Sequence, residues 1–179
     1  MSAATRSGRG STGEQAATMS ERIDFSVRIP FAQTLGLELW RFDGGHAELC
    51  VELVPALHNS FGVGHGGVLM TLLDVSMAHA ARSVHARTPL ADHGVVTIEM
   101  KTSFVQPAEG RLRCEARVLH RTATLAFCEG HVFDAAARLC AHGTGTFKYL
   151  RALPARRDVK PLQPARPDAS ASAPGDTSI

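Results

Sequence analysis

An aspartate, Asp74, stands in the middle of the most apolar segment of the chain, HGGVLMTLLDVSMAHAARSVH, which runs from His65 to His85. Its neighbours three and four residues away offer no cation: they are Met70, Thr71, Met77 and Ala78. Because an unpaired buried carboxylate is costly, we expect Asp74 to face a polar cavity or to be stabilised from outside its own helix. The alternative is that the helix has one exposed stripe and that Asp74 lies on it.

Two glycines, Gly66 and Gly67, stand at the start of this apolar segment. The first backbone N–H groups of a helix have no partner within the helix, and the macrodipole is positive there. Without side chains, the two glycines would let a substrate oxygen approach these donors closely. The pair is therefore a candidate oxyanion hole, although a tight entry turn or close packing would also require glycine.

A nucleotide-binding function is the competing interpretation of the same glycines. Gly62, Gly64 and Gly67 match the spacing of a G-x-G-x-x-G dinucleotide motif. That motif needs a strand running directly into the glycines and a βαβ unit around them. Here ALHNSF intervenes and only one long helix is expected afterwards, so we reject this interpretation.

Cysteines and histidines give no metal or redox motif. The four cysteines, at positions 50, 114, 128 and 140, form no C-x-x-C pair, and the nine histidines show no tight ligand spacing. We therefore expect no metal and no bound cofactor. Widely spaced cysteines are also compatible with a reduced cytoplasmic compartment, which we take as the location.

Length and composition favour one ordinary globular domain. The chain has 179 residues, of which 44% are hydrophobic and 20% charged, and no apolar run is long enough to cross a bilayer. Both ends are poor in large apolar side chains, so we expect tails at 1–22 and 151–179 around a domain at 23–150. That domain carries eleven basic and twelve acidic residues without a basic stripe, which argues against a nucleic-acid partner, and we expect no membrane association.

Hydrophobic patterns predict the elements that must position these residues. IPFAQTLG (29–36) predicts a short helix, and GLELWRF and HAELCVELV around Asp43-Gly44-Gly45 predict a hairpin. The segment after His65 predicts a helix about 30 Å long that is apolar, and therefore buried, all round. Four β-like runs follow, namely VVTIEMKTSFVQ, RLRCEARVLH, ATLAFCEGHVFD and RLCAHGTGTFKYL. The economical arrangement is α+β, a curved antiparallel sheet of five to six strands around one long helix.

Together, Asn59, the triplet His65-Gly66-Gly67 and an aspartate nine residues after the histidine resemble the signature of hotdog-fold acyl-CoA thioesterases of the phenylacetate-degradation (PaaI-like) type. The similarity spans roughly residues 30–149. It implies a long helix wrapped by an antiparallel sheet, an acyl-CoA substrate and hydrolysis to a free acid and CoA. CoA would be part of the substrate and not a cofactor.

Carried over by position, the resemblance assigns a role to each residue. Asp74 would activate the attacking water, or attack directly, and the Gly66 N–H and the Asn59 side chain would polarise the carbonyl. Thr97 would help to hold the water, and His65 would be structural or assist near the carbonyl. We expect the substrate pocket to be lined by Phe61, Gly67, Met70, Met77 and Phe104. The candidates for binding the CoA phosphates are Lys101, Arg111 and Arg113.

Helix geometry adds an expectation about assembly. Gly66 and Asp74 are eight residues apart, about 12 Å along a helix axis, yet both would have to act within about 3–4 Å of one carbonyl. One subunit therefore cannot supply both. We expect a homodimer, or a dimer of dimers, in which Asn59 and Gly66 of one chain meet Asp74 of another.

Two other functions of the same fold compete with hydrolysis. A non-catalytic acyl-CoA-binding module would need the pocket but not Asp74. A dehydratase acting on hydroxyacyl-CoA would need an Asp/His pair in a hydratase-type motif, which the sequence lacks. The carboxylate in the apolar helix favours the hydrolase.

Overall fold

The computed structural model describes residues 21–91 and 93–150. Apart from Glu21 and Arg22, the tails expected at 1–22 and 151–179 lie outside the described residues. The described part contains the whole span predicted to be the folded domain, except position 92.

The N-terminal elements form as the sequence patterns predict. Helix α1 (Pro30–Leu35) starts at a proline and ends at Gly36, whose left-handed φ of 72° suits a glycine C-cap. Strands β1 (Glu38–Asp43) and β2 (His46–Glu52) form the hairpin, with Asp43 paired to His46 across the turn. The alternating residues Ala47, Leu49 and Val51 are buried and give β2 its core-facing side.

The sheet has six antiparallel strands in the order β1-β2-β4-β5-β6-β3. After β2 come the 3-10 helix η1 (Pro55–Leu57), helix α2 (Gly66–Ser83) and the strands β3 (Gly94–Phe104), β4 (Arg111–Arg121), β5 (Leu125–Phe133) and β6 (Leu139–Leu150). β3 pairs with β6 and not with β4, its neighbour in sequence. One edge of the sheet is therefore β1 and the other is β3.

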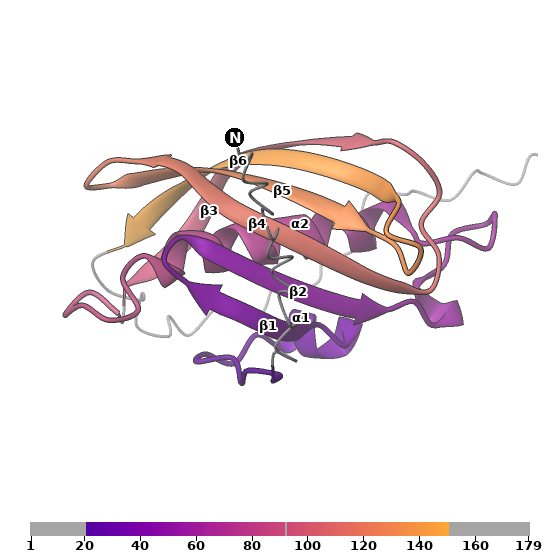
Figure 1. Cartoon of the computed structure of the whole chain (residues 1–179), viewed down its shortest axis with the longest axis horizontal. Helices are drawn as coiled ribbons and strands as arrows, with labels where there is room; N and C mark the ends of the chain where they lie inside the picture. Colours follow the sequence, from indigo (N-terminus) through magenta and orange to yellow (C-terminus); the bar gives the residue numbers. More distant parts are fainter. Residues whose placement is uncertain (1–20, 92, 151–179) are drawn as a thin grey trace, which may run out of the picture.

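Helix α2 lies against the concave face of the sheet and runs along it (Figure 1). Leu69, Leu72, Leu73, Met77 and Ala80 are buried between helix and sheet. The expectation of burial all round is wrong, because a stripe that includes Met70, Thr71, Asp74 and Ala78 stays partly exposed in the single chain. The sheet packs against one side of the helix, and this stripe lies outside that contact.

A pair of facing glycines sets how closely α2 approaches the sheet. Gly130 on β5 is the register partner of Gly143 on β6, and both lie under Leu73. A Cβ at Gly130 would come 3.0 Å from Leu73 Cδ2, and one at Gly143 would come 3.2 Å from Leu73 Cδ1. The missing side chains therefore make the space that the leucine fills.

Candidate active site

Asp74 is joined to the edge strand β3 by a short hydrogen bond. The hydroxyl of Thr97 donates to Asp74 Oδ1 over 2.6 Å. This is the range of a charge-assisted O–H···O⁻ bond, and it leaves Oδ2 available to accept from a water. Because its single hydrogen is used in this bond, the Thr97 hydroxyl can act toward that water only as an acceptor.

A β-bulge turns Thr97 toward the helix. The β3–β6 register shifts between Thr97 and Glu99, so Thr97 lies opposite the buried Phe147 and Glu99 opposite Thr146 on the outer face. In a regular strand, residues two apart would share a face. The extra residue, Ile98, therefore lets Thr97 point inward while Glu99 points outward.

Asp74 and Thr97 line a cavity of about 670 Å³ beside α2. Val75, Ala78 and His79 form its floor along the helix. The remaining walls come from the segment before α1, from β1, from the segment between α2 and β3 and from the start of β3, and they include Ile29, Phe42 and Val95. The carboxylate thus stands at a mainly apolar cavity of the size that holds small-molecule ligands.

At the start of α2, the backbone N–H of Gly67 is hydrogen-bonded within the described part of the chain and that of Gly66 is not. His65 is the N-cap residue, and its Nδ1 accepts from the Gly67 N–H over 2.9 Å. A neutral His65 therefore carries its proton on Nε2. Among the described residues the Gly66 N–H has no acceptor, so it is the donor that can meet a substrate oxygen. His65 has a structural role here, and Gly67 is satisfied by it.

Asn59 is oriented by the loop that contains it. Its Oδ1 accepts from the N–H of Phe61 (2.9 Å) and from the N–H of Val63 (3.4 Å). This local turn fixes the amide so that its oxygen is used and its NH₂ group, the donor half, is available.

Asn59 and Gly66 line a second cavity, of about 410 Å³, that shares no lining residue with the cavity at Asp74. Phe61 and Phe104 also line it, and a Cβ at Gly66 would lie 3.3 Å from the Phe104 ring. Within one chain, the candidate oxyanion donors and the candidate base therefore stand at separate cavities. Phe61 is 87% exposed, which is a large apolar surface for a single chain to leave uncovered.

Five further sequence candidates have different surroundings. Met77 is fully buried in the core beside Gly130, so packing accounts for it, whereas Met70 lies on the partly exposed stripe of α2. Among the basic candidates, Arg111 pairs with Glu38 and Arg113 with Glu48. Lys101 has no carboxylate partner among residues 21–91 and 93–150.

Sequence reasoning missed two residues of the larger cavity, His79 and Arg82. His79 is buried, its Nδ1–H donates to the Val75 carbonyl over 2.8 Å, and its ring lies edge-on to Phe25. Burial lowers the pKa of His79 to about 4, so the imidazole is neutral at pH 7. The sequence signal that could have identified them is their spacing from Asp74, since they follow it by five and eight residues on one helix.

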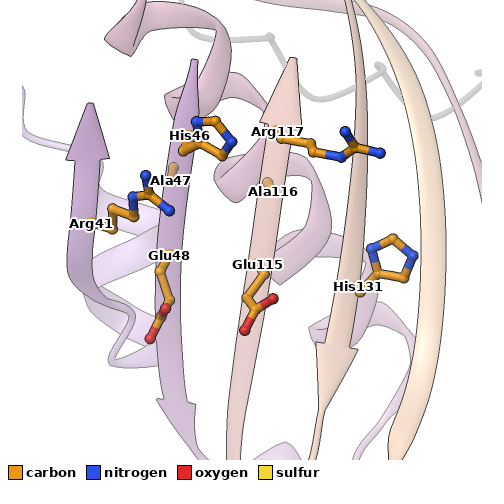
Figure 2. Close-up of a pocket in the computed structure, with 8 residues that line it drawn as sticks. All are labelled: Arg41, His46, Ala47, Glu48, Glu115, Ala116, Arg117 and His131. Atoms are coloured by element: carbon orange, nitrogen blue, oxygen red, sulfur yellow. The ribbon is translucent and has the colours of Figure 1, made fainter. Parts of the chain in front are cut away.

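The outer face of the sheet carries a separate, charged hollow of about 260 Å³ (Figure 2). His46, Glu48, Glu115, Arg117 and His131 stand on it, on strands β2, β4 and β5. Glu48 and Glu115 are register partners, and Arg113 forms ion pairs with both. Arg117 pairs with Glu129 in the same way. The charges balance one another on the face opposite α2, away from Asp74, as on an ordinary solvated sheet face.

Buried thiols and metal-ligating groups add no further chemistry to the described residues. Cys50, Cys114, Cys128 and Cys140 are free and buried, and burial raises the pKa of Cys114 and of Cys128 to about 12. These two thiols therefore stay protonated and are poor nucleophiles. Within residues 21–91 and 93–150, no group of three His, Cys, Asp or Glu side chains could hold a metal ion. In the same part of the chain no helix is long and apolar enough to span a membrane.

Comparison with known proteins places this chain in a family. The model of the thioesterase superfamily matches residues 61–141, which include Gly66, Asp74 and Thr97. A conserved protein of Pseudomonas aeruginosa of known structure is 35% identical, with a TM-score of 0.64 over 69% of this chain and 95% of that one. This chain is a member of the thioesterase superfamily. Its sheet and helix form the hotdog fold.

Two other relatives indicate how far the likeness extends. A Saccharolobus solfataricus protein named "Putative esterase" is 28% identical over 118 residues, 65% of this chain and 75% of that protein. The PaaI protein of the E. coli phenylacetic acid degradation operon has a TM-score of 0.61 over 67% of this chain and 83% of that one, but only 20% identity, and so shares the fold. The family and the esterase relative support a hydrolase that acts on thioesters or esters.

Proposed function

We propose that this protein is an acyl-CoA thioesterase, of the kind that the sequence resembles, and that Asp74 is its general base. The observation that carries the proposal is the 2.6 Å bond from the Thr97 hydroxyl to Asp74 Oδ1, at the wall of a ligand-sized cavity. The bond fixes one carboxylate oxygen and leaves the other without a partner among the described residues, so that it can accept from a water at this cavity.

In the proposed reaction the water oxygen attacks the thioester carbonyl carbon as Asp74 Oδ2 accepts a proton from the water. The Gly66 N–H and the Asn59 NH₂ group donate to the developing oxyanion. When the tetrahedral intermediate collapses, the C–S bond breaks and the departing thiolate takes the proton back from Asp74. The products are a carboxylic acid and CoA, and the protein needs no bound cofactor for these steps.

The two halves of the proposed site come from two subunits. Asn59 and Gly66 line one cavity and Asp74 and Thr97 the other, which supports a site shared across a dimer interface. β3 is the edge that a second copy would meet, since Val96 and Ile98 on it are 41% and 55% exposed. A strand edge with exposed apolar side chains is a ready pairing surface. Two-fold pairing gives two equivalent sites per dimer, and a dimer of dimers would repeat them.

A panel of short-chain, long-chain and aryl acyl-CoA thioesters, with release of the free thiol as the readout, tests the proposal. We expect turnover of at least one class by the wild-type protein, and loss of that turnover in Asp74→Asn. Tight binding of the thioesters without thiol release would instead identify a non-catalytic acyl-CoA-binding module.

A further inference from the structure

Arg82, in the last turn of α2, is a cation without a carboxylate partner in the described part of the chain. Its guanidinium Nη2 donates to the hydroxyl of Ser26 over 3.0 Å, and this partner is neutral. Arg82 is partly buried, and burial lowers its pKa. A partly desolvated guanidinium with spare N–H donors favours an anion with two oxygens, because its planar fork matches that geometry.

Arg82 lies in the same cavity as Asp74, the proposed general base. Arg82 and Asp74 line the same cavity and are eight residues apart on α2, about 12 Å along the axis. The wall between them is apolar and includes Val75, Ala78 and Phe42. His79, which also lies between them, is uncharged at pH 7 because burial lowers its pKa to about 4. The cavity thus has a base at one end, an apolar middle and Arg82 at the other end. Arg28 also lines the cavity, and its guanidinium donates to the side chain of Gln33.

We propose that Arg82 binds a carboxylate at the far end of the acyl group, so that the preferred substrates are thioesters of dicarboxylic acids. This inference rests on the proposed thioesterase function and specifies its substrate class. The thioester carbonyl would lie at Asp74, the methylene groups along the apolar wall and the free carboxylate at Arg82. Repulsion from Asp74 at one end and attraction to Arg82 at the other orient the chain in this direction.

A CoA phosphate is the other anion that could reach Arg82. The pantetheine arm between the thioester and the nearest phosphate is longer, when extended, than the separation of Asp74 and Arg82. A phosphate at Arg82 would therefore require a folded arm, whereas an acyl carboxylate requires only a chain of matching length. The C-terminal dipole of α2 also favours a cation in its last turn, but it does not require that cation to line the cavity.

Equilibrium binding of non-hydrolysable analogues tests Arg82 separately from catalysis. The probes are the thioether analogues of adipyl-CoA and hexanoyl-CoA, which differ in the terminal carboxylate, and the matching N-acetylcysteamine thioethers, which lack phosphate. We expect Arg82→Gln to weaken binding of both adipyl probes about 10- to 100-fold and to change the hexanoyl probes less than about threefold. Arg82→Lys should recover part of the loss.

Arg87→Gln is the matched control, because Arg87 is exposed and is not among the residues that line the cavity. It removes the same charge and should leave all four dissociation constants unchanged. An equal loss for adipyl-CoA and hexanoyl-CoA analogues with no change for the N-acetylcysteamine pair would assign Arg82 to a phosphate and overturn the proposal. A lower melting temperature without any selective loss of the adipyl probes would also overturn it. Hydrolysis of the corresponding thioesters is measured separately, so failure of the thioesterase function would be seen on its own.

Discussion

The Thr97 hydroxyl and the Asp74 carboxylate are 2.6 Å apart although 23 positions separate them in the sequence. Their hydrogen bond joins the edge strand of the sheet to the middle of the central helix. If Asp74 is the general base, this bond decides which of its oxygens meets the water.

Replacing Asp74 by asparagine tests the base directly. Asp74→Asn keeps the shape of the side chain and can still accept from Thr97, but it cannot take a proton. We expect the turnover number to fall about 10²- to 10⁴-fold with little change in melting temperature. Asp43→Asn, which alters an exposed aspartate on β1, is the control and should retain full activity. Activity of Asp74→Asn within about threefold of wild type would rule out the base assignment.

Thr97 is expected to act by positioning the carboxylate. Thr97→Val removes the hydroxyl at nearly constant shape and should lower the turnover number about 10- to 100-fold, the range expected for a hydrogen bond to a charged group. Thr97→Ser keeps the hydroxyl and should stay within a few-fold of wild type. Steady-state kinetics on the two variants separate the hydrogen bond from packing, and equal losses in both would assign Thr97 to packing alone.

Mixed dimers test whether a site is shared between subunits. Asn59→Asp keeps the oxygen that accepts from Phe61 and Val63 but replaces the NH₂ donor, so it should disable one half of the site without opening the loop. Co-expression with Asp74→Asn chains gives about half mixed dimers, each with one intact site, so about a quarter of wild-type activity should return. Verified mixed dimers with no recovered activity would show that each site lies within one chain.

Stability at mildly acidic pH should depend on His79. Its pKa is about 4 in the folded protein and about 6.5 in an unfolded chain, so above pH 6.5 both states are neutral and the group has no effect. As the pH falls from 6.5 to 4, only the unfolded state takes up the proton, and folding should lose up to about 3 kcal/mol. Chemical denaturation across this range should show a flatter profile for His79→Leu. His120→Gln, an exposed change on β4, should keep the wild-type slope.

Removal of residues 1–20 and 151–179 should change neither activity nor melting temperature by much. The composition of these segments cannot support a core, which is the basis of this expectation. Thermal melts and thiol-release assays on the two single truncations would detect a contribution from either one. A loss confined to the C-terminal truncation would indicate that this segment covers a neighbouring subunit.

Periodic elements could be predicted from the sequence, and long-range geometry could not. Alternation at Ala47, Leu49 and Val51 specified the buried face of β2, and the apolar run after His65 specified α2. That β3 lies beside β6 is decided by pairing between distant segments, which no local pattern carries. The bulge at Ile98 interrupts the period of two that a strand prediction assumes, so the direction of Thr97 was not predictable from alternation.

The residues of the candidate site also differ in whether the local sequence could reveal them. Asp74, Gly66 and Asn59 stood out because a carboxylate in an apolar helix and glycines at a helix start are locally unusual. Arg82 and His79 did not stand out, because an arginine in a last helical turn and a histidine within a helix are ordinary. Their relation to Asp74 appears only when the segment before α1 and the start of β3 close a cavity over them.

The glycine pair Gly130 and Gly143 lies on the sheet, outside the proposed site, but it influences the position of Asp74 through helix α2. Leu73, which fills the space above them, is the residue directly before Asp74. A methyl group added at either glycine would press on Leu73 and lift that turn of α2 away from the sheet, while Thr97 would remain anchored to β6. The length of the Thr97–Asp74 bond therefore depends on how closely α2 lies on the sheet. An alanine at either glycine would lower the rate of the proposed reaction without touching the substrate.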